Sequence, residues 1–189
     1  MTEMKSSITL IIGIVIGVLI GGATVYFTFP QAMVQQATVK HVTMDMLDFA
    51  FGVPSGSTAL KVKAGETITV TLTNRGQWDH EFRIVKDRDA YITNLEKVVG
   101  SLRPRGIEEQ SVVEASPAFK EALAFSSLNV IKTDSQTANT VLLKPWQTKT
   151  ITFAVDTPGS YSYICGLLDG SFSQTHARRG MYGPMEVLP

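Results

Sequence analysis

The stretch WQTKTITFAVDTPGSYSYIC, residues 146–165, contains two predicted strands and the turn that joins them. The turn residues Asp156-Thr157-Pro158-Gly159 interrupt a run rich in threonine, tyrosine and isoleucine, which are strand-forming residues. The second strand ends at Cys165, the only cysteine of the chain. This segment predicts a β-sheet protein and places the cysteine at the end of a strand.

Further short strands follow along the chain from residue 38. They are predicted in residues 40–51, in residues 59–76 on both sides of a turn at 64–66, in residues 80–85 and in residues 183–189. In the segment 59–76, Ile68, Val70 and Leu72 alternate with threonines, which is typical of a strand with one buried face. Many short strands at regular spacing predict an all-β sandwich or barrel.

Residues 87–143 are less regular than the segments around them and are too long for a simple loop in a compact sandwich. Ser116 is placed to cap a helix over residues 116–125, with Pro117 at its first position. Residues 89–99 predict a second short helix. We therefore expect a partly helical insertion in the β-sheet domain.

Residues 7–29 form an apolar run without a charged side chain. The run is long enough for a transmembrane helix and longer than the apolar region of a usual signal peptide, which is the alternative interpretation. Lys5 is the one basic residue before it and favours a cytoplasmic N-terminus. We expect residues 1–37 to be a single-pass anchor and linker in the cell membrane. Residues 38–189 would then form a domain on the extracytoplasmic side, periplasmic or extracellular.

The composition excludes several classes of function. The chain has 189 residues, 17 basic and 17 acidic side chains, a pI near 6.8 and no basic run, so nucleic-acid binding has little support. One cysteine cannot form an internal disulfide or an all-cysteine zinc site, nor an iron–sulfur cluster built from this chain alone.

The segment CGLLDGSFSQTHARRGMYG, residues 165–183, contains three side chains that bind soft metals, namely Cys165, His176 and Met181. Copper held for electron transfer takes a thiolate, two imidazoles and a weak axial ligand, often methionine. Taken singly, each of these residues is more often structural. Taken together, on the strands of a β protein, they predict a metal site.

The second imidazole has to come from one of the two remaining histidines. His80 begins the predicted strand 80–85, which in a sandwich can lie beside the strand that ends at Cys165. His41 begins the first strand after the linker and has no such placement. His80 is therefore the expected partner, and His41 is expected to have no metal role.

The domain at residues 38–189 resembles a cupredoxin, a type 1 blue copper protein. KAGETITVTLTNRGQWDHEFRIV resembles the segment before the first histidine ligand, TPGSYSYIC the strand that delivers the cysteine, and HARRGMYGPMEV the histidine and methionine that close the site. The resemblance implies a Greek-key cupredoxin β-sandwich that binds one type 1 copper ion through His80, Cys165 and His176, with Met181 as axial ligand. It extends to membrane-anchored relatives of the sulfocyanin and rusticyanin type.

Two features depart from the family pattern. Ten residues separate Cys165 from His176, more than in many small cupredoxins, which leaves the exposure of the site and its docking face open. Glu81 follows the first histidine, where small cupredoxins often carry asparagine. The asparagine side chain that steadies the ligand loop is thus missing, while a backbone N–H can still reach the cysteine sulfur.

The resemblance implies a carrier of single electrons, not an enzyme, with a redox donor and acceptor such as membrane respiratory complexes. The exposed edge of His176 would be the electron port, and Arg178 and Arg179 beside it would favour an acidic partner. A copper carrier or assembly factor without redox cycling is the alternative, which Cys165 argues against. A two-copper oxidase site needs two cysteines and a copper reductase needs further histidines, so this chain alone supports neither.

Overall fold

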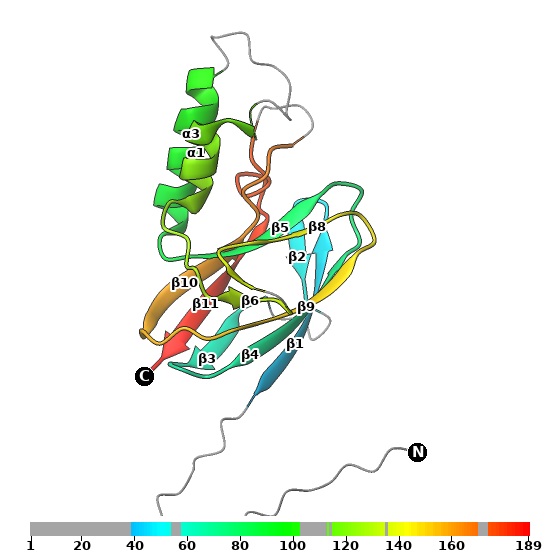
Figure 1. The fold of residues 1–189 in the computed structure, drawn as a ribbon, viewed down its shortest axis with the longest axis vertical. Helices are drawn as coiled ribbons and strands as arrows, with labels where there is room; N and C mark the ends of the chain where they lie inside the picture. The colour runs from blue at the N-terminus through cyan, green and yellow to red at the C-terminus, as the bar shows by residue number, and fades with distance from the viewer. Residues whose placement is uncertain (1–38, 54–57, 103–112, 114, 135, 170–173) are drawn as a thin grey trace, which may run out of the picture. The chain divides into compact units, whose positions relative to one another are not determined.

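The computed structural model describes residues 39–53, 58–102, 113, 115–134, 136–169 and 174–189. Two β-sheets pack face to face, and two helices lie side by side at one end of them (Figure 1). The all-β prediction is therefore confirmed. The predicted anchor at residues 7–29 lies outside the described residues. Within the part that is described, no helix has the length and apolar character needed to cross a membrane.

The first sheet has the strand order β2-β1-β4-β9-β6-β7 among the described residues. Its strands are β1 (Lys40–Leu47), β2 (Ala50–Gly52), β4 (Ile68–Asn74), β6 (Ile131–Lys132), β7 (Thr137–Ala138) and β9 (Thr148–Phe153). Strands β1 and β4 run parallel, and the other neighbours are antiparallel.

The second sheet has the order β3-β11-β10-β5-β8. Its strands are β3 (Leu60–Lys63), β5 (His80–Val85), β8 (Val141–Leu143), β10 (Gly159–Ile164) and β11 (Tyr182–Leu188). Strands β3 and β11 run parallel, and β10 is antiparallel to both β11 and β5. The strand that leads to Cys165 thus lies between the strand that begins at His80 and the strand that follows His176.

Both predicted strand–turn–strand segments cross from one sheet to the other. In residues 59–76, β3 joins the second sheet and β4 the first, and in residues 146–165, β9 joins the first sheet and β10 the second. The two crossovers contact each other, because the Gly65 N–H donates to the Val155 carbonyl at 3.1 Å. These crossovers lie at one end of the sandwich. The start of β5 and the end of β10, where His80 and Cys165 lie, are at the opposite end.

The space between the sheets is filled by apolar side chains. Ile68, Val70 and Leu72, whose alternation predicts a buried face, are fully buried there. Cys165 and Met181 belong to the same core cluster. Two of the four predicted ligands are therefore anchored in the main hydrophobic core.

The two helices are α1 (Arg88–Leu102) and α3 (Pro117–Ala124), close to the helices predicted at 89–99 and 116–125. Ser116 caps α3, because its hydroxyl accepts the Phe119 N–H at 3.2 Å. The helices share a second core cluster that includes Leu95 and Phe119. Residues 131–143, which lie within the predicted insertion, instead supply strands to both sheets.

Replacing Leu95 by alanine should lower the free energy of unfolding by about 2–5 kcal/mol, because Leu95 is fully buried between the helices and the second sheet. Chemical denaturation of the purified protein measures this change. Lys97→Ala on the exposed face of α1 is the control. Equal stability of the two variants would mean that the helices do not pack as described.

Candidate metal centre

The antiparallel pairing of β5 with β10 brings the first two ligands together. Tyr163 pairs with Ile84 and Ile164 pairs with Arg83, so the end of β10 lies beside the start of β5. Cys165 follows β10 directly, and His80 is the first residue of β5. This confirms the predicted placement of His80 beside the cysteine strand, whereas His41 lies exposed on β1.

The segment between β10 and β11 brings His176 back to the cysteine. The His176 N–H donates to the Leu167 carbonyl at 2.7 Å, and the Met181 N–H donates to the His176 carbonyl at 2.9 Å. The Cys165 N–H in turn donates to the Met181 carbonyl at 3.1 Å. Backbone hydrogen bonds therefore join Cys165, His176 and Met181 in spite of the ten residues between the first two.

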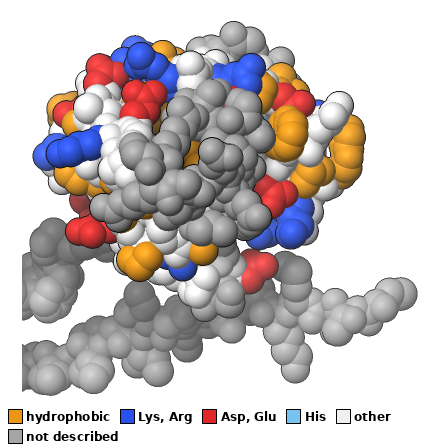
Figure 2. Space-filling model, turned by 90° about the horizontal axis from the view of Figure 1, so that it is seen from above, with side chains coloured by type: hydrophobic (Ala, Val, Ile, Leu, Met, Phe, Trp, Pro, Cys, Tyr) orange, Lys and Arg blue, Asp and Glu red, His pale blue; other side chains and the backbone are white. Residues whose placement is uncertain are grey.

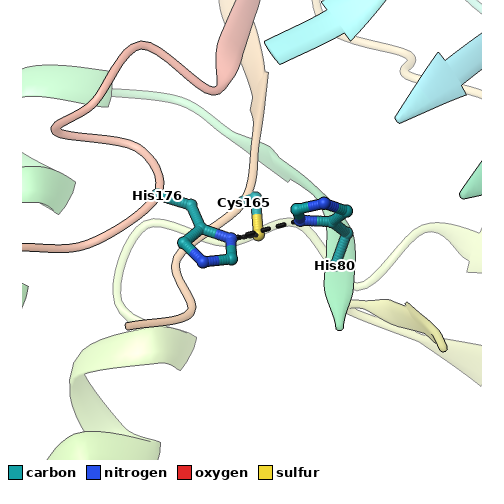
Figure 3. Close-up of side chains that lie close together, drawn as sticks. All are labelled: His80, Cys165 and His176. Atoms are coloured by element: carbon teal, nitrogen blue, oxygen red, sulfur yellow. Dashed lines mark hydrogen bonds between the residues drawn. The ribbon is translucent and has the colours of Figure 1, made fainter. Parts of the chain in front are cut away.

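Three donor atoms converge at the end of the sandwich (Figure 3). His80 Nδ1 lies 3.2 Å from His176 Nδ1, which lies 3.4 Å from Cys165 Sγ. The metal-binding atoms of the three residues all lie within 4.8 Å of one another. His80 and Cys165 have no exposed surface, and His176 is 1% exposed.

Burial keeps both imidazoles neutral. Loss of solvation lowers the pKa of His80, against the opposing influence of Asp48. Loss of solvation and then the neighbouring His80 lower the pKa of His176 to about 4. Burial and the Glu81 carboxylate raise the pKa of the Cys165 thiol, which therefore stays protonated until a cation replaces the proton.

The donor set fits a type 1 copper ion. Neutral imidazoles and a thiolate are the ligands that such a site uses; the two Nδ1 atoms face each other, and that of His176 also lies beside the sulfur. Among the described residues, the Nε2 atom of each ring has no hydrogen-bond partner, and that of His80 lies 3.6 Å from Asp48 Oδ1, so each ring keeps its Nδ1 side for the cluster. The cluster of His80, Cys165 and His176 supports one type 1 copper site.

Met181 is fully buried beside this cluster and is joined to two of its members through the backbone. The hydrogen bond from Cys165 to Met181 continues the pairing of β10 with β11, since Ile164, just before the cysteine, pairs with Tyr182, just after the methionine. This placement is compatible with the predicted axial role, which stays a prediction.

Glu81 makes two contacts with the cysteine turn. Its N–H donates to Cys165 Sγ at 3.3 Å, which is the backbone hydrogen bond that remained available without asparagine. Its Oε1 accepts the Gly166 N–H at 2.9 Å. Arg83 pairs with the same carboxylate at 3.1 Å, and both side chains are almost fully buried. Burial alone would lower the pKa of Arg83, but Glu81, Tyr91 and Cys165 together outweigh this effect and raise it.

The prediction that His176 has an exposed edge is wrong, because this residue is 1% exposed and Phe49 packs against its ring. The two rings meet edge to face with centroids 5.1 Å apart, and Arg179 lies 3.8 Å above the Phe49 ring. Phe49 sits in the turn between β1 and β2 with a positive φ of 65°, a strained conformation for an aromatic residue. Next to it, Asp48 Oδ1 lies 3.6 Å from His80 Nε2.

The two arginines after His176 both pair with acidic side chains. Arg178 lies 3.4 Å from Glu96 on α1, and Arg179 lies 3.2 Å from the buried Asp169. Figure 2 looks down on the end of the molecule at which Figure 1 shows the helices, and basic and acidic side chains are interspersed around its rim. The positive charge expected beside the site is thus largely compensated within the chain.

Several residues of the site could not be found from the ligand pattern. The pattern singles out Glu81 only as the residue after the first histidine and does not indicate its bond to Gly166. It gives no indication of Arg83, Asp48 or Phe49. The available signal is the spacing of Glu81 and Arg83, since a strand places residues i and i+2 on the same face.

The comparisons with known proteins concern the fold. No family model matches the chain, and no curated protein matches it. A reduced auracyanin from the photosynthetic bacterium Roseiflexus castenholzii is 21% identical, with a TM-score of 0.47 over 79% of this chain and 98% of the other. Auracyanin A of Chloroflexus aurantiacus, a "blue" copper protein, is 23% identical, with a TM-score of 0.45 over 78% of this chain and 98% of the other.

A copper-containing nitrite reductase from Thermus scotoductus SA-01 is 18% identical, with a TM-score of 0.41, over 80% of this chain and 28% of the other. Because these identities and TM-scores are low, the function is inferred from the geometry of the site.

The metal-free protein should lose stability as the pH falls from 6.5 to about 4. The unfolded chain takes up a proton at His176 near pH 6.5, whereas the folded chain does so only near pH 4. The full loss from this residue is on the order of 3 kcal/mol. Denaturation at a series of pH values measures it, and His176→Asn should show a shallower slope over this window. An unchanged slope in that variant would contradict the buried neutral imidazole.

Proposed function

We propose that this chain is a membrane-anchored, mononuclear blue copper protein of the cupredoxin type that carries single electrons between redox partners. The observation that carries the proposal is the convergence of His80 Nδ1, His176 Nδ1 and Cys165 Sγ in a site without solvent exposure. The β-sandwich around it is the architecture that the cupredoxin resemblance implies. The likeness to sulfocyanin and rusticyanin is part of the same proposal.

The chain's own residues hold the ligands in one arrangement. His80 and Cys165 are fixed by paired strands, and His176 and Met181 by backbone hydrogen bonds of the segment that joins β10 to β11. Bound copper would supply a one-electron couple. Burial excludes water from the donor atoms, and packed ligands change little in position, which favours electron transfer over reactions that need an open coordination position.

Burial also argues against the alternative of a copper carrier. A protein that delivers copper needs a path by which the ion can leave, but all three cluster residues are at most 1% exposed. Repeated cycles of oxidation and reduction in the presence of a copper chelator separate the two functions. An electron carrier keeps its copper through the cycles, whereas a carrier of copper loses it to the chelator.

The anchor, the location outside the cytoplasmic membrane and the exchange of electrons with membrane respiratory complexes complete the proposal. They rest on the apolar run 7–29 and on Lys5 before it. Membrane fractionation of the full chain, with protease added from the outside of intact cells, tests the location of residues 38–189.

Replacing Cys165 by serine should abolish the strong visible absorption of the copper-loaded, oxidised protein, because that absorption needs a thiolate bound to Cu(II). Absorption and EPR spectra measure the effect. His41→Ala is the control, since His41 is exposed on β1, and this variant should keep the full spectrum. A band of unchanged intensity in Cys165→Ser would contradict the ligand assignment.

Replacing Phe49 by alanine should make electron exchange with a small inorganic oxidant several-fold faster, because it uncovers the His176 ring. Stopped-flow mixing of the reduced, copper-loaded protein with hexacyanoferrate measures the rate. Phe125→Ala, which removes an exposed phenylalanine at the end of α3, is the matched control. If both variants exchange electrons at the wild-type rate, Phe49 does not limit the access of the oxidant to His176.

A further inference from the structure

A buried ion pair lies against the cysteine turn, on the face of β5 that the helices cover. Glu81 and Arg83 are each 3% exposed, and Arg83 donates from Nε to Glu81 Oε1 at 3.3 Å and from Nη2 to Oε2 at 3.1 Å. Thr140 donates a third hydrogen bond to Oε2 at 3.0 Å. A buried carboxylate that accepts this many charge-assisted hydrogen bonds is held in one orientation.

The carboxylate held in this way bonds to the residue directly after the metal-binding cysteine. Its Oε1 accepts the Gly166 N–H at 2.9 Å, while the Glu81 backbone N–H reaches the sulfur of Cys165 at 3.3 Å. One residue therefore contacts the cysteine turn at two consecutive positions, once through its side chain and once through its backbone.

The cysteine turn is closely packed at Gly166. A Cβ at position 166 would overlap the Tyr91 hydroxyl and come within 3.0 Å of Glu81 Oε1, so glycine is needed for the close approach. The Arg83 guanidinium is tied to the helical segment as well, because its Nη1 donates to Ser127 Oγ at 3.2 Å. The ion pair thus links the cysteine turn to β5 and to the segment after α3.

We propose that Glu81 is a positioning residue for the copper-binding cysteine, with its carboxylate fixed by Arg83 so that the Cys165–Gly166 turn presents the sulfur to the two imidazoles. This inference rests on the proposed copper site. The pair also sets the local charge, since Glu81 favours Cu(II) over Cu(I) and Arg83 has the opposite effect.

The first test does not need copper. Glu81→Asp keeps the charge but is one methylene shorter and cannot hold both Arg83 and the Gly166 N–H. Hydrogen exchange of the metal-free full chain, followed by NMR, should show the Gly166 amide exchanging about tenfold faster. Glu96→Asp, which shortens the acid paired with Arg178, is the matched control. Gly166 exchange that is the same in both variants would overturn the inference.

The second test uses the copper-loaded protein. Glu81→Gln should raise the reduction potential, Arg83→Met should lower it, and the double variant should lie between them, which a merely structural role would not produce. Thr140→Val, which removes one hydrogen bond to the carboxylate without changing the charge of the pair, provides a milder variant if the charge variants do not fold. It should change the copper EPR hyperfine splitting less than Glu81→Asp does. Shifts of the same sign in Glu81→Gln and Arg83→Met, or a larger EPR change in Thr140→Val, would overturn the inference.

The two tests also separate this inference from the proposed function. If the wild-type protein binds no copper, the proposed function fails, and the Gly166 exchange rates still show whether Glu81 holds the cysteine turn. If copper binds with a thiolate spectrum and the exchange rates do not change, the copper site stands and the role of Glu81 fails.

Discussion

The antiparallel pairing of β5 with β10 is the constraint on which the site depends. His80 is the first residue of β5 and Cys165 follows β10 directly, so the pairing of the two strands is enough to bring them together. The next pairing, of β10 with β11, brings Met181 to the same end. His176 lies outside these strands, and backbone hydrogen bonds with Leu167 and Met181 hold it in position.

The chemistry of the metal centre follows from burial. Two imidazoles and a thiol in an apolar core are costly unless they are neutral or bind a cation, which is why the histidine pKa values fall and the thiol pKa rises. On the opposite face of β5, under the helices, the buried Glu81 carboxylate is paired with Arg83, and losing either member of such a pair costs about 3–5 kcal/mol.

The strands, the two helices and the cluster of three ligands could be predicted because each depends on local patterns and on a simple rule for neighbouring strands. The crossing of both strand–turn–strand segments between sheets could not, since a crossover and a hairpin have similar turn residues. In HEFRIV, residues 80–85, Glu81 and Arg83 alternate with apolar residues, which is typical of a solvent-exposed face. The helices nevertheless cover both side chains. Phe49 covers His176 from a distant turn, and a contact between such remote positions leaves no local signal.

The helical segment explains why the long cysteine-to-histidine connection does not loosen the site. Leu168 in that connection and Ala177 directly after His176 pack in the helical core together with Leu95, while Cys165 and Met181 pack in the core of the sandwich. The ligand segment is thus held between two apolar clusters. Electron transfer needs ligands that move little between oxidation states, and the second core supplies packing that holds this ligand segment in place.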